Sequence, residues 1–399
     1  MSTTALPEPW TTARLGWLFQ PVSDRGHEDE MVLSVYRDHG VIPKDSRTDN
    51  FNRTPENLSN YQLVQPGDLV VNRMKAWQGS LGISEHQGIV SPDYEVLRPT
   101  VPEYDRRFLH SLLRSRALID QYALRSTGIR PSQWRLYWNE MKAIEISLPA
   151  AEQQRAIADY LDRETARIDT LIEEQQRLIE MLRERRHSLV DGVFGGPAPN
   201  VRLQNACIDV VDCPHTTPEV SDDGEYEAVR TASVRNGKYR PGNGLPVDAD
   251  TWKARNAAGA PTVGDVLFTR EAPAGEACMV PNDRICLGQR MVLLRIDHTV
   301  CVGAFLLWQI YSDRVQGHFR LSANGSTVAN VRLPVLRTTP IWLPDLTEQR
   351  RIATYLDEQT AKIDNLITET EQFIELSKER RSALITAAVT GQVDVREMA

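Results

Sequence analysis

Arginines interleaved with amide and hydroxyl side chains are the residues of this sequence best suited to a chemical task, and that task is nucleic-acid recognition. Seven arginines fall between Arg106 and Arg135, where Asp120 is the only acidic residue. Between Tyr311 and Arg337, four arginines are mixed with asparagine, serine and threonine, and Asp313 is the only acid. Cationic side chains hold phosphates, whereas amide and guanidinium groups read base edges. Both segments therefore predict contact with DNA, although arginines on helices are often simply solvated.

Two similar Gly-Asp turns each lead into a further candidate segment. Gly67-Asp68 precedes an expected strand at 68–72, and Gly264-Asp265 precedes one at 265–269, in line with the turn preference of this pair. Another strand is expected at 290–296. Basic residues follow both turns. The candidate DNA-binding residues are therefore Arg73, Lys75, Gln78, Arg125, Arg130, Gln133, Arg135, Arg270, Arg320, Asn324, Asn330 and Arg332.

Catalytic motifs do not accompany these residues. The sequence lacks a G-x-x-x-x-G-K-[ST] phosphate loop, an Asn-Pro-Pro-aromatic methyltransferase motif, G-x-S-x-G and H-E-x-x-H. Pro92-Asp93 with Glu95 resembles part of a nuclease motif, but Leu97 and Arg98 stand where a lysine is required. We therefore expect a chain without catalytic activity of its own.

Cysteine usage argues against both a disulfide framework and a metal site. The five cysteines all lie in the second half of the chain, and their number is odd. Cys207, Cys213 and His215 could begin a zinc site, but a tight pair and a clear fourth ligand are missing. We expect no metal site and a reducing compartment.

Composition is that of a globular protein of 399 residues, with 41% hydrophobic and 25% charged residues. No long apolar run and no signal-peptide pattern are present, so a cytoplasmic location is expected. The net charge of −8 is unfavourable for binding DNA. Most of it, however, falls in 148–196 and 343–399, which leaves the other two blocks nearly neutral.

The chain contains an internal duplication at an offset of 195 residues. Leu148-Pro149 and Leu343-Pro344 open two segments that align without a gap to Gly196 and Gly391, with about half of the positions identical. Neither segment has an interior proline or glycine over 155–191 or 350–389. Each predicts a helix of about 40 residues, roughly 60 Å long at ~1.5 Å per residue.

Each predicted helix carries an apolar stripe that requires a partner. The simplest partner is the other copy, packed antiparallel within one chain. A generic coiled coil joining unrelated domains is a weaker alternative, because it does not explain the duplication. The candidate interface residues are Leu161, Ile168, Leu171, Ile172, Leu178 and Leu182 in the first helix, and Leu356, Ile363, Leu366, Ile367 and Phe373 in the second.

The remaining blocks are expected to be two globular domains of mixed α/β structure. The predicted order is a first domain at 1–147, a long helix at 148–196, a second domain at 197–342, a second long helix at 343–392 and a tail at 393–399. The fold class is therefore α/β mixed, with two domains alternating with two helices that pair as an antiparallel coiled coil.

This plan resembles the specificity subunits of type I restriction–modification systems, the HsdS family, over essentially the whole chain. The resemblance rests on the Leu-Pro-x-x-x-(Glu/Gln)-Gln-x-x-Ile-Ala-x-Tyr-Leu-Asp segments at 148 and 343 and the Thr-Ala-(Arg/Lys)-Ile-Asp-x-Leu-Ile that follows. Asp212-Cys213-Pro214-His215-Thr216-Thr217-Pro218 is similar to the opening of a target-recognition domain in that family. Gly325-Ser326-Thr327-Val328 is similar to the family's closing stretch, with Thr127-Gly128-Ile129-Arg130 as a looser copy. The first domain lacks the Asp-Cys-Pro-His opening.

The resemblance implies the partners and the task. Each globular domain would bind one half of a split, asymmetric site on double-stranded DNA, and the paired helices would set the separation of the halves. Two methyltransferase subunits, and in some assemblies two restriction subunits, would bind the scaffold. S-adenosylmethionine, ATP and Mg²⁺ would belong to those partners, and none to this chain.

Other interpretations remain open from the sequence. The chain could serve a methylation-only or related non-type I system, and neighbouring genes would decide. It could also be a coiled-coil scaffold that binds no DNA, or a nuclease acting alone, which the motif search disfavours.

Overall fold

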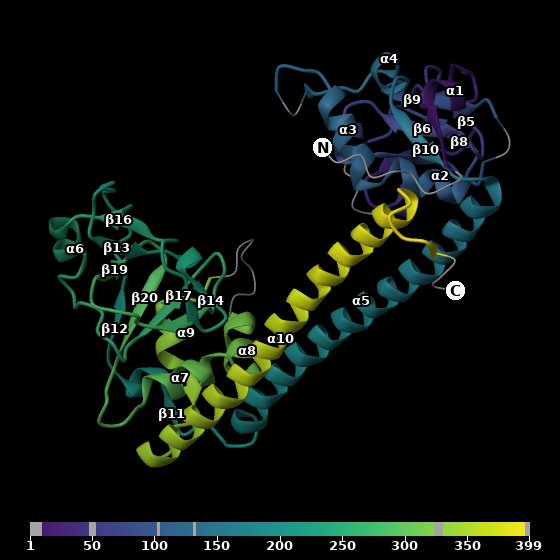
Figure 1. The fold of residues 1–399 in the computed structure, drawn as a ribbon. Coiled ribbons are helices and arrows are strands. Elements are labelled where there is room, and N and C mark those ends of the chain that lie inside the picture. Colours follow the sequence, from purple (N-terminus) through teal and green to yellow (C-terminus); the bar gives the residue numbers. More distant parts are fainter. Residues whose placement is uncertain (1–9, 48–52, 102–103, 131–132, 323–329, 396–399) are drawn as a thin grey trace. The chain divides into compact units, whose positions relative to one another are not determined.

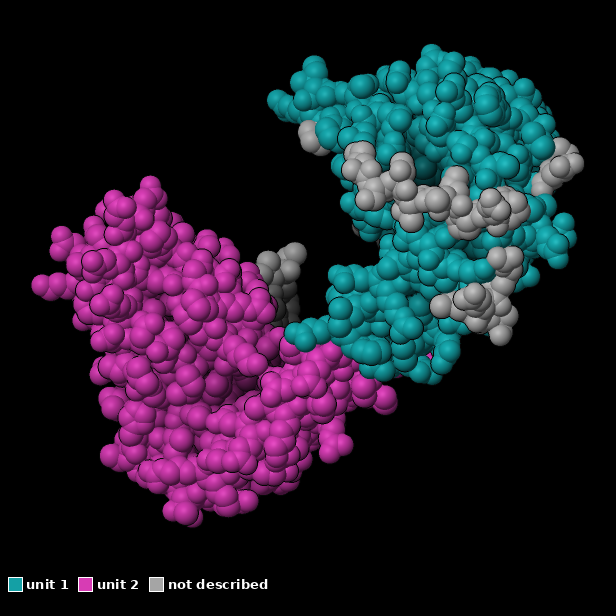
Figure 2. Space-filling view, viewed as in Figure 1, with its two compact units in different colours: residues 1–175, 372–399 teal, residues 176–371 magenta. Residues whose placement is uncertain are grey.

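The computed structural model describes residues 10–47, 53–101, 104–130, 133–322 and 330–395. These residues form two compact units, one made of 1–175 and 372–399 (unit 1) and the other of 176–371 (unit 2), as coloured in Figure 2. Each unit combines a mixed α/β domain with part of both long helices, α5 (Ala151–Phe194) and α10 (Leu346–Val389). The predicted fold class is confirmed. Within the described residues, no helix is both long and apolar enough to cross a membrane.

The domain of unit 1 is built on a four-stranded antiparallel sheet in the order β2-β9-β6-β7. Strand pairs β3–β4 and β5–β8 lie beside it, and β1 pairs with β10 where the domain enters α5. Its elements are β1 (Thr11–Arg14), α1 (Leu15–Leu18), β2 (Phe19–Val22), β3 (Leu33–Tyr36), β4 (Gly40–Pro43), η1 (Lys44–Ser46), β5 (Gln62–Val64), β6 (Leu69–Asn72), η2 (Ala76–Gln78), β7 (Leu81–Ile83), β8 (Gly88–Val90), β9 (Tyr94–Pro99), α2 (Arg106–Leu113), α3 (Arg116–Arg125), α4 (Trp138–Met141) and β10 (Glu145–Leu148).

The domain of unit 2 repeats this plan, with a four-stranded sheet in the order β12-β20-β17-β18. A smaller sheet, β16-β13-β19, and the pair β14–β15 accompany it, and β11 pairs with β21. Its elements are β11 (Val201–Arg202), η4 (Leu203–Ala206), β12 (Cys207–Asp212), β13 (Tyr226–Val229), η5 (Thr231–Ser233), β14 (Val234–Arg235), β15 (Lys238–Tyr239), β16 (Leu245–Val247), α6 (Ala249–Arg255), β17 (Val266–Thr269), β18 (Ala277–Met279), β19 (Ile285–Leu287), β20 (Met291–Ile296), α7 (Gly303–Ile310), α8 (Asp313–Ser322), α9 (Leu333–Thr338) and β21 (Pro340–Ile341).

The duplication therefore includes the domains as well as the long helices. An offset of 197 residues relates the starts of three pairs of elements: β6 with β17, α2 with α7, and α3 with α8. The strands expected at 68–72, 265–269 and 290–296 are confirmed, each beginning one residue later. Both domains thus present their elements in the same order to their segment of the long helices.

Buried aspartates explain why the Gly-Asp turns form. Gly67 and Gly264 adopt φ of +103° and +106°, a conformation that favours glycine. Asp68 accepts hydrogen bonds from the Gln65 backbone N–H and from Arg98 at 2.9–3.1 Å. The equivalent Asp265 accepts from Thr262 N–H and from Ile296 N–H at 3.1 and 2.9 Å. Each carboxylate thereby fixes the turn that starts the central strand.

In both units the long helices pack against each other antiparallel, as Figure 1 shows for α5 and α10. In unit 1, Leu161 near the start of α5 shares a core with Ala388 and Val389 near the end of α10. In unit 2, Val190 near the end of α5 shares a core with Ile352 and Leu356 near the start of α10. The expected antiparallel pairing of the two copies is confirmed.

The residues in the seam differ in part from those expected. Leu161, Leu182, Leu356 and Ile363 are buried, and Ile168, Leu171, Ile172 and Ile367 are half-buried. Leu178, Leu366 and Phe373 lie outside the seam, with exposed fractions of 36, 49 and 43%. Ile179, Thr370, Ile374 and Ser377 are buried instead. The Thr370 hydroxyl donates to the Leu366 carbonyl of its own helix at 2.7 Å, which satisfies a polar group in the seam.

A duplicated glutamine attaches each domain to its helix. Gln154 and Gln349 are 1% and 0% exposed. The side-chain oxygen of Gln154 accepts from the Asp105 N–H at 3.0 Å, just before α2, and that of Gln349 accepts from the Val302 N–H at 2.8 Å, just before α7. Their amide groups donate to the carbonyls of Pro149 and Pro344. The glutamine of the repeated motif therefore has a structural task.

Candidate nucleic-acid interface

Two segments that lie far apart in the sequence form one surface in unit 1. The backbone N–H of Leu136 donates to the carbonyl of Arg73 at 2.9 Å. Thr127 and Arg135 exchange backbone hydrogen bonds of 3.0 and 2.9 Å, which close the loop that follows α3. The Arg135 guanidinium lies 3.7 Å from the Met74 sulfur. The candidate residues at 73–78 and 130–135 are therefore neighbours, although no sequence pattern links the two segments.

Tryptophans hold this surface in place. Trp77 and Trp134 pack edge to face with ring centroids 5.4 Å apart, and Trp77 donates its indole N–H to the Met74 carbonyl at 3.1 Å. Around them, Lys75, Gln78, Arg130 and Gln133 are exposed. Arg125 is half-buried and donates to the Gln121 side chain at 2.5 Å. The exposed members are placed to contact a ligand, whereas Arg125 is partly engaged within α3.

Unit 2 has the same backbone arrangement with different side chains. The N–H of Val331 donates to the carbonyl of Arg270 at 2.9 Å, as Leu136 does to Arg73. Asn330 donates its amide to Glu271 at 2.9 Å. Arg320, in the last turn of α8, and Arg332, which follows Val331, are exposed. Asn324, and the Gly325-Ser326-Thr327-Val328 stretch, lie outside the described residues.

Arg73 and Arg270 are engaged within their own domains. Arg73 donates to the carbonyls of Pro92 and Asp93 at 2.5 and 3.0 Å, and its side chain is 25% exposed. Arg270 places Nη1 2.9 and 2.8 Å from the two carboxylate oxygens of Asp212, and its side chain is 15% exposed. These contacts favour a supporting role for both arginines over the direct phosphate contact expected from sequence.

A groove in unit 1 adds candidate residues that the sequence did not single out. Lys75 and Gln78 line it together with tyrosines and cations from β3, β9 and the segments that follow β4. Lys44 donates to Thr54 at 2.8 Å, and the Arg47 guanidinium lies 5.5 Å from the Tyr36 ring centroid. The additional lining residues of this kind are Tyr36, Lys44, Arg47, Arg53, Tyr61 and Tyr94. In the sequence this signal is diluted by Asp38, Asp45 and Asp49.

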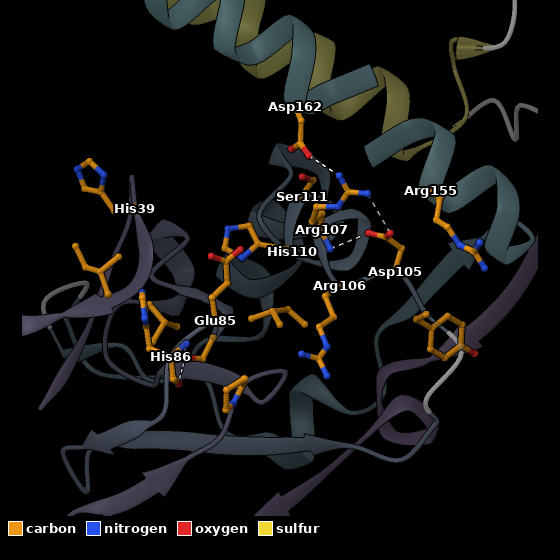
Figure 3. Close-up of a pocket in the computed structure, with 16 residues that line it drawn as sticks. His39, Glu85, His86, Asp105, Arg106, Arg107, His110, Ser111, Arg155 and Asp162 are labelled. Carbon is orange, nitrogen blue, oxygen red and sulfur yellow. Dashed lines mark hydrogen bonds and ion pairs between the residues drawn. The ribbon is translucent and has the colours of Figure 1, made fainter. Parts of the chain in front are cut away.

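A second cavity in unit 1, drawn in Figure 3, is occupied by ion pairs that attach α2 to α5. The Arg107 guanidinium lies 2.7 Å from Asp162, 2.8 Å from Asp159 and 3.4 Å from Asp105. Burial and the nearby Arg114 cation lower the pKa of His110 to about 4, so this imidazole is neutral at pH 7. The charges here balance, and the cavity offers no clear anion site.

Thiol and metal chemistry finds little support at the candidate surface. All five cysteines are free, and burial raises the pKa of Cys207, Cys278 and Cys301 to about 12, so these thiols stay protonated. Among the described residues, His187, Asp191 and Asp313 bring possible ligand atoms within 4.8 Å of one another. The His187 Nε2 lies 3.2 and 3.1 Å from the two carboxylates, the geometry of an exposed ion pair.

Comparison with known proteins finds similarity to one family. Residues 211–376 match the model of the type I restriction modification DNA specificity domain. The MjaX specificity subunit assigned to a type I restriction enzyme of Methanocaldococcus jannaschii is 20% identical over 364 residues, which are 86% of this chain and 81% of the relative. The resemblance recognised from the repeated motifs is thus confirmed.

Solved structures share the fold over nearly the full length. A chain from a type I restriction–modification system, solved to describe complex assembly and conformational transition, is 18% identical, with a TM-score of 0.75 over 98% of this chain and 100% of that one. The HsdS subunit from Thermoanaerobacter tengcongensis is 20% identical, with a TM-score of 0.58 over 98% and 99%. At these identities the likeness concerns the fold.

Proposed function

We propose that this chain reads a split DNA site for a type I restriction–modification system. The match of residues 211–376 to the type I restriction modification DNA specificity domain supports this function. One observation carries the proposal. In unit 1, the residue after strand β6, Arg73, accepts a backbone hydrogen bond from Leu136, which lies between α3 and α4. In unit 2, the residue after strand β17, Arg270, accepts the equivalent hydrogen bond from Val331, which lies between α8 and α9. The same backbone frame presents different exposed side chains in each unit. Two domains that share a backbone arrangement but expose different side chains are suited to binding two different DNA sequences.

The two candidate surfaces predict an asymmetric site. Unit 1 presents Lys75, Gln78, Arg130 and Gln133, a set rich in groups that bind phosphates and the edges of guanine or adenine. Unit 2 presents Arg320 and Arg332. Because direct readout depends on the donors and acceptors that each surface offers, the two half-sites should differ in sequence.

The long helices supply matching positions for partner proteins. Leu178 and Met181 of α5 are 36 and 57% exposed, and the duplicated positions of α10, Phe373 and Leu376, are 43 and 63% exposed. Residues three positions apart are neighbours on a helix surface, and contiguous exposed apolar groups mark interaction sites. Since the duplication provides this surface twice, it fits two copies of one partner, which we assign to the methyltransferase subunits.

Chemistry in this proposal belongs to the partners. The candidate surfaces consist of arginine, lysine and amide groups, which bind and orient DNA. S-adenosylmethionine, and in a restricting assembly ATP and Mg²⁺, would be bound by the methyltransferase and restriction subunits.

Site selection tests the proposal. The full chain, co-purified with the methyltransferase subunit of its system, would be incubated with random-sequence duplexes, and the retained DNA would be sequenced. Enrichment of two different short sequences at a constant spacing supports the proposal. Retention of DNA without any enriched sequence would contradict it.

A further inference from the structure

One exposed leucine occupies the same place in both domains. Leu124 is 78% exposed in the last turn of α3, and Leu321 is 75% exposed in the last turn of α8. The two positions differ by the 197 residues that relate the domains. Single exposed leucines are ordinary on protein surfaces. This pair differs from a single exposed leucine because the same residue type is exposed at equivalent positions of two diverged helices.

Neighbouring positions show how unusual this identity is. The inward faces of the helices are similar, with Tyr122 and Phe319 both buried. The outward faces differ: Ala123 corresponds to Arg320, and Arg125 to Ser322. Among the exposed large apolar residues of the described segments outside the long helices, only Leu124 and Leu321 occupy equivalent positions. The positions beside it have diverged, whereas the leucine is present in both copies.

The sequence segments that contain the two leucines are rich in cations. Between Arg116 and Leu136 the only acidic residue is Asp120, which is paired with Arg116 at 3.0 Å, and between Arg314 and Arg337 the sequence has no acid. Leu124 directly precedes the loop that carries Arg130 and Arg135, and Leu321 follows Arg320. An apolar group within a segment that has more cations than acids complements DNA better than it complements an ordinary protein surface.

We propose that Leu124 and Leu321 each pack against the apolar surface of a DNA base when their domain binds its half-site. This inference rests on the proposed function and extends it by naming one contact in each domain that carries no charge. The apolar surface can be the C5 methyl group of thymine in the major groove, or the face of a base at an unstacked step. The cations beside each leucine would hold the flanking phosphates.

Photo-crosslinking in the intact assembly tests the contact. A benzophenone amino acid would replace Leu124 or Leu321, one at a time, in the full chain bound to its methyltransferase subunit and to a labelled duplex that contains the selected site. Trp17 and Val263, which are 64 and 70% exposed at other positions of the two domains, serve as matched controls. We expect DNA adducts from positions 124 and 321 above the control level. Adducts with the methyltransferase subunit, or no DNA adduct above the controls, would overturn the inference.

Affinity measurements separate an apolar contact from a phosphate contact. Leu124→Ala and Leu321→Ala should each weaken specific binding by about tenfold, the loss expected for one buried leucine side chain. The dependence of affinity on salt concentration should stay unchanged, because no charge is removed. If wild-type assembly selects a site and both variants bind it with unchanged affinity, this inference fails while the proposed function stands. If the wild type selects no site, the proposed function itself fails.

Uracil substitution distinguishes the two sources of apolar surface. Replacing every thymine of the site by uracil removes the C5 methyl groups and leaves the pairing intact. A loss of affinity in the wild type that is absent in the alanine variants assigns the contact to a methyl group. Equal binding of both duplexes by the wild type, with the alanine defect retained, assigns it to a base face.

Discussion

Arg186 of α5 lies 3.1 Å from Asp364 of α10, and the duplicated residues Arg381 and Asp169 form the same ion pair at 2.9 Å. Antiparallel pairing of two copies of one helix places the arginine of each copy opposite the aspartate of the other. The same ion pair therefore occurs once in each unit, between residues related by the 195-residue offset. The two pairs nevertheless differ in their surroundings, because Asp364 also binds Lys238 at 2.7 Å and Arg186 lies over the Trp308 ring.

The two pairs should therefore contribute unequally to stability. Arg186 and Asp364 are 22 and 26% exposed, whereas Arg381 and Asp169 are 39 and 48% exposed. We expect Arg186→Ala to lower the free energy of unfolding by about 1–3 kcal/mol, since it leaves a hydrogen-bonded carboxylate short of a partner. Arg381→Ala, the matched control, should cost less than about 1 kcal/mol. Urea denaturation followed by tryptophan fluorescence measures both, and equal losses would contradict this reasoning.

Asp212→Asn distinguishes the two possible tasks of Arg270. Arg270 can support the loop through its hydrogen bonds to both carboxylate oxygens of Asp212. In that case the substitution weakens the Arg270–Asp212 pair and lowers the affinity for specific DNA. If instead Arg270 contacts a phosphate, removal of the nearby negative charge raises affinity. We expect the first result, together with a coupling of about 0.5–3 kcal/mol between Asp212→Asn and Arg270→Ala in a double-mutant cycle of stability. Higher affinity of Asp212→Asn would assign Arg270 to the interface.

Exposed arginines beside the loops should act on affinity and on its salt dependence together. Arg130→Ala and Arg332→Ala are each expected to weaken specific binding, and each lost phosphate contact should reduce the salt slope by about one. Arg177→Ala, an exposed arginine on α5, is the matched control. Binding titrations at several salt concentrations provide both values. If neither variant changes affinity or slope, these arginines do not belong to the interface.

Charge placed on the exposed helix positions should remove one methyltransferase copy at a time. Leu178→Lys with Met181→Lys, or Phe373→Lys with Leu376→Lys, puts two cations into the expected apolar contact. Native mass spectrometry should show the loss of one partner copy for either double variant and of both for the quadruple variant. The substituted side chains are exposed, so the fold should tolerate the changes. Retention of two copies by the quadruple variant would place the partner surface elsewhere.

Periodicity and repetition made the helices and their pairing predictable, because both are local patterns of the sequence. The exposure of Leu178 and Phe373 could not be predicted from the apolar pattern. Thr370 and Ser377 are buried in the seam, and a search for apolar residues alone does not identify such polar positions. Hydroxyl groups that bond their own helix make this possible.

The residue types of the candidate interface could be predicted from the sequence, but the contacts that bring these residues together could not. The charge pattern identified Arg130 and Arg332, but the junction of Arg73 with Leu136 joins residues 63 positions apart through backbone atoms, which leave no trace in side-chain types. Likewise, the partner of Arg270 is Asp212, 58 residues away, so its internal pairing could not be inferred from neighbours in the sequence. Long-range contacts of this kind require the fold.

N6-methyladenine would be mapped across the genome of the native host, with and without this gene. We expect a split, asymmetric motif that is methylated in the parent strain, loses its methylation when the gene is deleted and regains it when the gene is restored. A methylated split motif that persists unchanged after deletion would contradict the role of this chain as the reader of the DNA site.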